Sequence, residues 1–216
     1  MYKVLYPIKD ATIYSKFPDQ NTGMDQILEL GKSLYNIPDF ENEYNPSTTV
    51  SRILIQFDIS GISTLYGINA EYYLTLRAAD SNALSTNYNI NAYAISGSWT
   101  NGYGYSNNNP IRTDKWVSGS LPINVTSSYT DTVGGGTWFT DFSSSQTFNF
   151  ELPDIRMNVT NIVNRWISGS IENNGFIIKF PTESEFDLNN YGNMNFYSMN
   201  SHTIYLPRLE AYWNST

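Results

Sequence analysis

Apolar and polar residues alternate with a period of two along most of the chain. The clearest case is the segment SRILIQFD, residues 51–58, in which Ile53, Ile55 and Phe57 alternate with polar positions. Leu54 is the one apolar residue on the polar side, so the pattern predicts a half-buried strand. Similar patterns predict about nine strands in total. The other predicted strands cover residues 4–13, 27–31, 72–77, 88–95, 148–152, 175–180, 194–199 and 204–213.

One segment follows the helical period instead. Val159, Ile162, Val163 and Trp166 are spaced i, i+3, i+4 and i+7, which places them on one face of a short helix at about residues 158–168. Asn158 is the expected N-cap, and Gly169 follows the expected end of the helix. Such a helix commonly closes one open end of a sandwich. We therefore interpret Trp166 as a core residue rather than a ligand-binding one.

The fold class follows from how the strands are connected. Asn, Gly, Ser and Pro separate most of them, and no helices lie between them that could carry parallel crossovers. The 17 Tyr, 11 Phe and 5 Trp among 216 residues suit pleated surfaces. The prediction is an all-β fold: one domain, residues 1–216, forming an antiparallel two-sheet sandwich of jelly-roll type.

Two long segments are predicted to be loops, at residues 32–49 and 96–137. The first is polar and carries Pro38 and Pro46. The second is rich in Gly, Asn, Ser and Tyr, a composition that gives contact area at low entropic cost. It is the candidate binding loop, and its alternative role is to cover a sheet edge with Trp99 and Trp116. The candidate binding residues are Trp99, Tyr103, Tyr105 and Trp116.

Charge and residue usage exclude several function classes. The net charge of −8 repels phosphate backbones, and no run approaches the roughly 20 apolar residues of a membrane span, so we expect neither nucleic-acid binding nor membrane insertion. The chain has no cysteine, and His202 is its only histidine, which excludes metal sites built from several imidazoles. A serine triad would need His202, yet no nucleophile-elbow motif is present, so we interpret it as a hydrogen-bonded structural residue. We expect no enzymatic activity and no cofactor.

Two acidic groups deserve separate consideration because carboxylates can hold calcium or act in pairs on glycosidic bonds. The first comprises Asp39, Glu41 and Glu43, and the second comprises Glu183, Glu185 and Asp187. Neither group has the ligand spacing and glycine of a calcium loop. We interpret both as solvated acidic loops, although a carboxylate-dependent polysaccharide lyase or hydrolase stays as a further alternative.

Five strings cover nearly the whole chain outside residues 96–137: DATIYSKFPDQNTGMDQILELG, SRILIQFDIS, AEYYLTLRAA, VTNIVNRWISGSIENNGFIIKF and NFYSMNSHTIYLPRLEAYW. Together they resemble the DNRLRE-type β-sandwich modules, which are related to bacterial carbohydrate-binding modules. The matching positions are Asn21, Gly23, Arg52, Phe57, Asp58, Trp166, Gly169, Asn173, Gly175, Phe176, Phe196, Ser198, Pro207 and Leu209.

Within that family, the chain is most similar to free-standing virion structural proteins of marine T4-like tailed phages. The resemblance implies a protein that docks on the tail, baseplate or capsid through contacts with other virion proteins. The first residues alternate in strand fashion and show no secretion signal, which fits assembly in a host cytoplasm and a location in the virion. The alternative is a carbohydrate-binding or adhesion module for a host-surface glycan, and no sugar-contacting position transfers from the family to this sequence.

Overall fold

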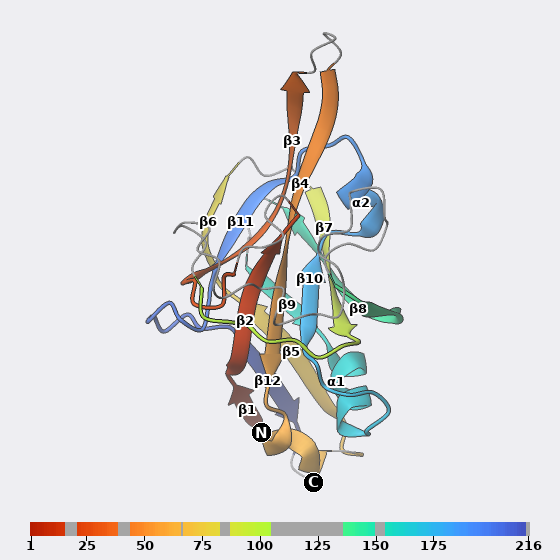
Figure 1. Cartoon of the computed structure of the whole chain (residues 1–216). Coiled ribbons are helices and arrows are strands. Elements are labelled where there is room, and N and C mark those ends of the chain that lie inside the picture. The colour runs from red at the N-terminus through yellow and green to blue at the C-terminus, as the bar shows by residue number, and fades with distance from the viewer. Residues whose placement is uncertain are drawn as a thin grey trace.

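In the part of the chain that the structure describes, twelve strands, all paired antiparallel, form two sheets that pack face to face (Figure 1). This computed structural model describes residues 1–15, 21–38, 44–65, 67–82, 87–104, 136–149 and 154–214. The four-stranded sheet has the order β1 (Tyr2–Leu5), β12 (Arg208–Trp213), β5 (Ala70–Leu76) and β9 (Ile155–Asn158). The larger sheet has the order β6 (Ala78–Asn82), β11 (Gly192–Tyr197), β3 (Ile27–Pro38), β4 (Tyr44–Phe57), β10 (Phe176–Lys179), β7 (Asn87–Ile95) and β8 (Trp138–Asn149), and β2 (Pro7–Tyr14) also pairs with β4. The predicted antiparallel sandwich is confirmed.

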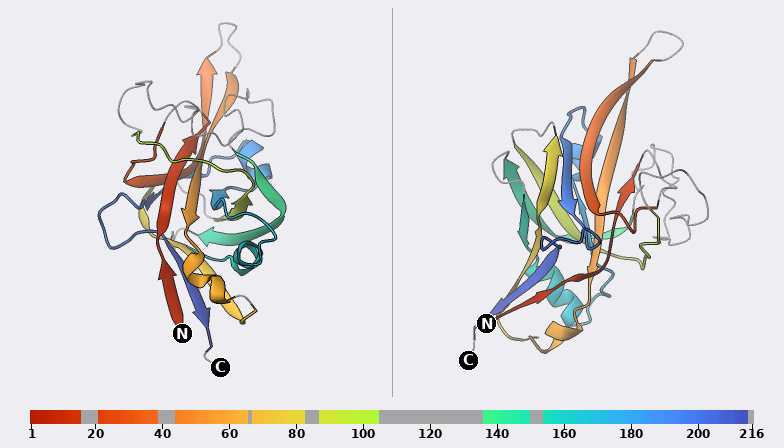
Figure 2. Two further views of the ribbon diagram at one scale, coloured as in Figure 1. Left: turned by 60° about the horizontal axis from the view of Figure 1, so that its bottom comes forward. Right: turned by 90° about the vertical axis from the view of Figure 1, so that its left-hand side faces the viewer.

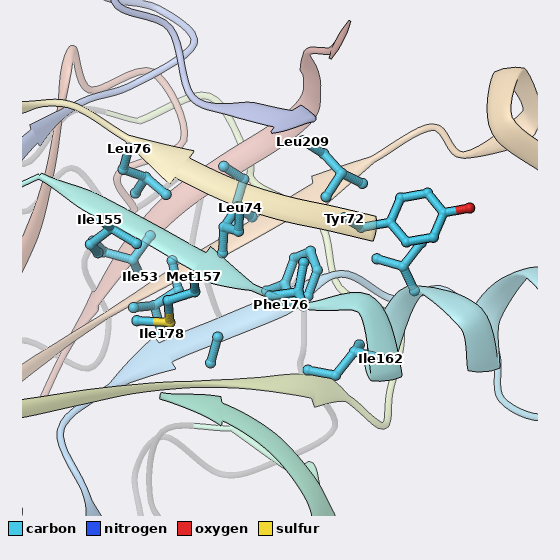
Figure 3. Packing of buried hydrophobic residues seen from close by; sticks show 14 of the residues in the cluster. Ile53, Tyr72, Leu74, Leu76, Ile155, Met157, Ile162, Phe176, Ile178 and Leu209 are labelled. Atoms are coloured by element: carbon cyan, nitrogen blue, oxygen red, sulfur yellow. The ribbon is translucent and has the colours of Figure 1, made fainter. Parts of the chain in front are cut away.

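The strand patterns correctly identify the residues that fill the space between the sheets. Ile53 and Phe176 of the larger sheet face Leu74 and Met157 of the smaller one, and all four are buried (Figure 3). Trp166 is buried against Phe176 with the ring centroids 4.6 Å apart, as expected for a core residue. The sequence underestimates the number of strands, because β6 and β9 are only five and four residues long and carry little periodicity.

The prediction that residues 51–58 form a half-buried strand is wrong, because residues 51–55 of β4 are buried on both faces of the sheet. Leu54 lies on the outer face of the larger sheet, yet its exposed fraction is 0%. It belongs to a second apolar cluster, outside the main core, that also contains Ala11, Ile13, Ile95, Trp99 and Ile177. This part of β4 therefore lies in the middle one of three layers. The smaller sheet packs on one side of the larger sheet, and the segment that carries Trp99 packs on the other.

The predicted helix is present as α1 (Thr160–Ile167), and Gly169 follows it with a left-handed φ of 73°. The N-cap is Val159 rather than Asn158, although the Asn158 side chain accepts a hydrogen bond from the Thr160 amide at 3.0 Å. The sequence patterns do not predict two shorter helices, η1 (Ser60–Leu65) and α2 (Thr182–Phe186), because segments of six and five residues are too short to show a helical period. Within the described ranges, no helix is long and apolar enough to cross a membrane.

The predicted loop at 32–49 is instead a long β-hairpin. Residues 32–38 continue β3 and residues 44–49 begin β4, with partners in register from Gly31 and Ser51 out to Pro38 and Tyr44. Among the described strands, residues 33–38 and 44–49 pair only with each other, and the hairpin projects beyond the sandwich (Figures 1 and 2). Pro38 and Pro46 are tolerated because the projecting strands have free edges, where a missing amide donor costs little.

A buried carboxyl group on β2 is expected to make stability depend on pH. Asp10 is 1% exposed and accepts a hydrogen bond from the Met199 amide at 2.7 Å. Burial raises the pKa of Asp10 to about 7, although the Met199 amide opposes this shift. In the unfolded chain the same group has its ordinary pKa of about 3.9. Between these two values the folded state holds a proton that the unfolded state has lost, so stability falls as the pH rises through this window.

We therefore expect Asp10→Asn to be more stable than the wild type at pH 8 and nearly equal to it at pH 4, because an amide resembles the protonated carboxyl group. Urea unfolding of both proteins across this range measures the difference in unfolding free energy. That difference should grow with pH up to about 7 and then level off. A difference that is the same at every pH would contradict the prediction.

Candidate docking surface and binding cleft

The four predicted binding residues do not form one site. Trp99 is buried, with 2% of its surface exposed, whereas Tyr103 is 81% exposed a few residues later. Tyr105 and Trp116 lie outside the described residues, as does most of the predicted loop at 96–137. The described parts of that loop, residues 96–104 and 136–137, contain no helix or strand.

Trp99 packs on the outer face of the larger sheet. Its indole N–H donates to the Asn174 carbonyl at 2.7 Å, and the Lys9 amine lies 4.6 Å from the ring centroid. Lys9 also donates to the Trp99 carbonyl. These contacts agree with the alternative interpretation, in which Trp99 covers a sheet, and they leave its ring unavailable for stacking on a sugar.

The second acidic group is not a solvated loop, because two of its members pair with buried cations. We call Lys32, Arg52, Lys179, Glu185 and Asp187 the ionic clamp. Arg52 donates to both oxygens of Glu185, from Nε at 2.9 Å and from Nη2 at 2.8 Å, and Lys179 Nζ lies 2.9 Å from Glu185 Oε2. Glu185 is 1% exposed, and α2 carries it over the outward side chains of β4 and β10.

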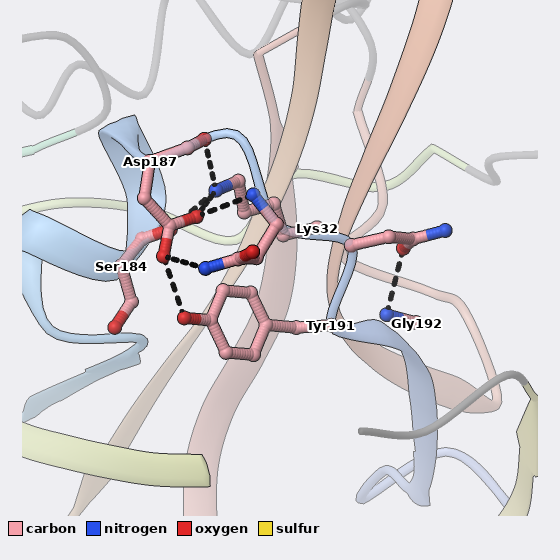
Figure 4. Close-up of polar contacts among 7 residues, drawn as sticks. Lys32, Ser184, Asp187, Tyr191 and Gly192 are labelled. Carbon is pink, nitrogen blue, oxygen red and sulfur yellow. Dashed lines mark hydrogen bonds and ion pairs between the residues drawn. The ribbon is translucent and has the colours of Figure 1, made fainter.

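Lys32 forms the other half of the ionic clamp (Figure 4). Its amine donates to the carbonyl and carboxylate oxygens of Asp187 and to the Ser184 carbonyl. Burial alone would raise the pKa of Asp187, but hydrogen bonds from Lys32, Tyr191 and Asn189 hold it well below its usual range. Lys32 belongs to β3 and Arg52 to β4. The ionic clamp therefore binds both strands to the segment of α2 and Asp187, at the point where the hairpin leaves the sandwich.

The ionic clamp has a structural role, because its charged side chains are engaged in ion pairs and hydrogen bonds within the described part of the chain. Burial lowers the pKa of Lys179, while the charge of Glu185 opposes that shift. The three N–H groups of Lys179 meet three acceptors: Phe180 O, Thr182 Oγ1 and Glu185 Oε2. Asp39, Glu41 and Glu43 lie outside the described residues. Over the described ranges, no group of three His, Cys, Asp or Glu side chains is placed to hold a metal ion.

The described part of the chain does not support the interpretation of His202 as a hydrogen-bonded structural residue. His202 is exposed, and its backbone adopts a left-handed φ of 54° in the turn between β11 and β12. Among the described residues, none hydrogen-bonds to its imidazole ring.

Three tyrosines and an arginine lie in a row on the outer face of the four-stranded sheet. We call this surface the tyrosine face. Its members are Tyr2 on β1, Tyr212 on β12, Tyr73 on β5 and Arg156 on β9. The rings of Tyr2 and Tyr212 stack with centroids 5.9 Å apart, and Tyr73 meets Tyr212 edge to face, also at 5.9 Å. The Arg156 guanidinium lies 4.0 Å from the Tyr73 ring centroid. Tyr2 is 67% exposed and Tyr212 is 37% exposed. The result is a continuous aromatic and cationic strip across all four strands.

Two glutamates fix the orientation of these tyrosines. Tyr212 donates its hydroxyl to Glu210 at 2.9 Å, and Tyr73 donates to Glu71 at 3.0 Å. The hydrogen bond to Glu210 raises the pKa of Tyr212. The rings are thus ordered before any partner arrives, which lowers the entropic cost of a contact. The alternating pattern YYLTL in β5 indicated part of this surface, because it places Tyr73 on the side of the strand opposite the buried Tyr72 and Leu74.

An open cleft lies at the end of the sandwich, between the turn after η1 and the exposed side of α1. It has a volume of about 600 Å³ and is lined by residues 67–69 and by Asn161, Asn164, Arg165 and Ser168. Asn161, Asn164 and Arg165 of α1 and the C-cap residue Ser168 are spaced i, i+3, i+4 and i+7, on the side opposite the buried Trp166. The hydrophobic pattern located this helix but gave no sign of a cleft beside it.

The motif residues of the proposed family have structural roles in this fold. Asn21 Oδ1 accepts hydrogen bonds from the amides of Gly23 at 3.1 Å and Gly104 at 2.6 Å, which joins two loops. Asn173 donates to the Phe57 carbonyl at 2.9 Å and accepts from the Gly175 amide at 3.1 Å. Neither a protein-family model nor a curated protein sequence matches the chain. The resemblance therefore rests on these motifs and stays a prediction.

Proposed function

We propose that this protein is a non-catalytic structural component of a tailed-phage particle, and that the tyrosine face docks it on a neighbouring virion protein. The tyrosine face carries this proposal. Tyrosine and arginine are the residue types that most often dominate binding energy at protein interfaces, and here they form one preordered strip. Glu71, Glu210 and Arg208 surround it with polar groups of both signs, as in the rim of a protein interface.

Other properties support the same role. The sequence lacks cysteine and has one histidine, which removes a cysteine nucleophile and metal sites built from several imidazoles. The projecting hairpin offers a second element that can reach a neighbouring subunit, and the ionic clamp fixes its base. Glycan binding through the loop at 96–137 has weaker support, because Trp99 is buried and Tyr103 is the one exposed ring of the four predicted residues within the described part of the chain.

Phage particles provide the direct test. Quantitative mass spectrometry of purified particles should detect the protein in a stoichiometric ratio to known virion subunits. In particles made with the double variant Tyr73→Ser/Tyr212→Ser, the copy number of the protein should fall about tenfold or more, because two rings that anchor the contact are removed. Tyr103→Ser is the matched control, since it removes an exposed tyrosine from a different surface. Its incorporation should equal that of the wild type.

Two outcomes would overturn the proposal. Absence of the protein from purified particles would refute the virion role. Equal incorporation of the double variant and the wild type would refute docking through the tyrosine face. Thermal unfolding of both purified variants checks that their folding is intact.

A further inference from the structure

We infer that the tyrosine face binds the tyrosine face of a second copy of this chain, in a dimer with two-fold symmetry. This inference rests on the proposed function and names the neighbour that the tyrosine face contacts there. The observation that carries it is the distribution of charged side chains around the three tyrosines, which the register of the four strands fixes.

The register arranges the outward side chains of the four-stranded sheet in three rows that run across the strands. They point outward because the residues between them, such as Tyr72, Leu74 and Leu209, are buried in the core. The first row contains Tyr2, Tyr212 and Glu71, the second contains Val4, Glu210, Tyr73 and Asn158, and the third contains Arg208, Thr75 and Arg156. The first and third rows are four residues apart along β5 and β12, which corresponds to about 13 Å.

The first and third rows carry opposite charges that lack a counter-ion. In the first row, Glu71 is exposed and accepts a hydrogen bond from the Tyr73 hydroxyl at 3.0 Å, but no cation pairs with it within the described ranges. In the third row, Arg208 donates to the Ile204 carbonyl at 2.7 Å, and no described carboxylate pairs with it. A hydroxyl or a carbonyl group leaves such a charge without compensation.

The remaining charges of this surface are compensated within the chain. Arg156 Nη2 lies 3.8 Å from Glu210 Oε2, and Arg77, at the end of β5, pairs with Asp154. The net result is one uncompensated negative charge at one end of the tyrosine face and one uncompensated positive charge at the other.

A surface of this kind is complementary to itself. A two-fold axis that lies in the plane of the face, along the middle row, places the first row of each copy on the third row of the other. Each Glu71 then meets the Arg208 of the other copy, and the Tyr73 rings meet near the axis. A two-fold axis parallel to the strands would instead place like rows, and therefore like charges, against each other. Charge complementarity thus selects both the second copy and its orientation.

Sedimentation velocity of the full chain tests for the dimer. The four strands of this sheet have four to seven residues each, so the interface is small. We therefore expect a monomer–dimer equilibrium with a dissociation constant in the micromolar range, measured from about 1 to 300 μM protein. Raising the salt concentration from about 50 mM to 0.5 M should weaken the dimer about threefold or more, because it screens the two symmetry-related ion pairs.

Exchanging the two charges tests the contact between Glu71 and Arg208. Arg208→Glu and Glu71→Arg should each weaken dimerisation about tenfold or more, because each places like charges together twice. The double variant Arg208→Glu/Glu71→Arg restores opposite charges and should recover a dissociation constant within about threefold of the wild type. Glu183→Arg is the matched control, since it makes the same charge change on α2, and it should leave dimerisation unchanged.

A wild-type chain that stays monomeric at about 300 μM would overturn the inference. A double variant that folds, as judged by thermal unfolding, and dimerises no better than the single variants would overturn it as well. The two proposals fail separately. A monomeric chain that is nevertheless incorporated into particles refutes only the dimer, whereas a dimer in solution that is absent from particles refutes only the virion role.

Discussion

Replacing Glu185 with glutamine is expected to lower the free energy of unfolding by about 3–5 kcal/mol, because it leaves buried charges without their counter-ion. Glu185 is the common partner of Arg52 and Lys179, and all three side chains are buried. Glutamine keeps the shape of the side chain but removes its charge. Arg52 and Lys179 then repel each other while both lie about 5.2 Å from the Trp138 ring centroid. Urea unfolding at pH 7 measures the loss.

Glu183→Gln is the matched control for this change. Glu183 lies on the same short helix, two residues earlier, but is exposed. The same substitution there should change the unfolding free energy by less than about 0.5 kcal/mol. If the two variants were equally stable, the ionic clamp would contribute nothing to folding.

The second large effect is expected from Gly175→Ala at the start of β10. Gly175 has a left-handed φ of 88°, and an added Cβ would lie 2.4 Å from the Ile55 carbonyl oxygen and 2.9 Å from Gln56 Cα. Both atoms belong to the backbone of β4, which cannot move aside without breaking its pairing with β10. Conformational strain and this collision together should cost more than about 3 kcal/mol.

Gly169→Ala separates the two causes. Gly169 has a similar φ of 73°, but an added Cβ there meets nothing within 4 Å. The variant should therefore lose only the left-handed penalty of about 1–2 kcal/mol. Thermal and urea unfolding of both proteins give the comparison. Equal losses at the two positions would show that the contact with β4 is unimportant.

The features that could be predicted from the sequence are those set by local periodicity. Ile53, Ile55 and Phe57 alternate over a whole strand, and Val159 to Trp166 follow the helical period, so their buried faces are correct. The alternation puts Leu54 on an exposed face, because the pattern of one strand cannot reveal what packs on it. On that face it packs against Trp99 and lies beside Ala11 and Ile13 of the paired strand β2, all of which are remote in sequence.

The ionic clamp and the cleft were missed for a related reason. Lys32 and Asp187 are 155 positions apart, and no local pattern links them. One signal was present: Lys179 stands inside the apolar run FIIKF, where a charge is costly unless it is paired. The hairpin was missed because its polar residues and prolines resemble a loop, and only the geometry shows that its free edges accept them.

The length of β4 has a mechanical consequence. This strand of 14 residues is paired with β3 from Tyr44 to Ser51, with β2 from Ser51 to Phe57, and with β10 from Ile53 to Ile55. A force that pulls the hairpin outward along its axis therefore loads the hydrogen bonds of β4 in shear, so that many must break at once. Tension applied to the hairpin would be transmitted along β4 to the centre of the larger sheet, where the pairings with β2 and β10 would resist it together.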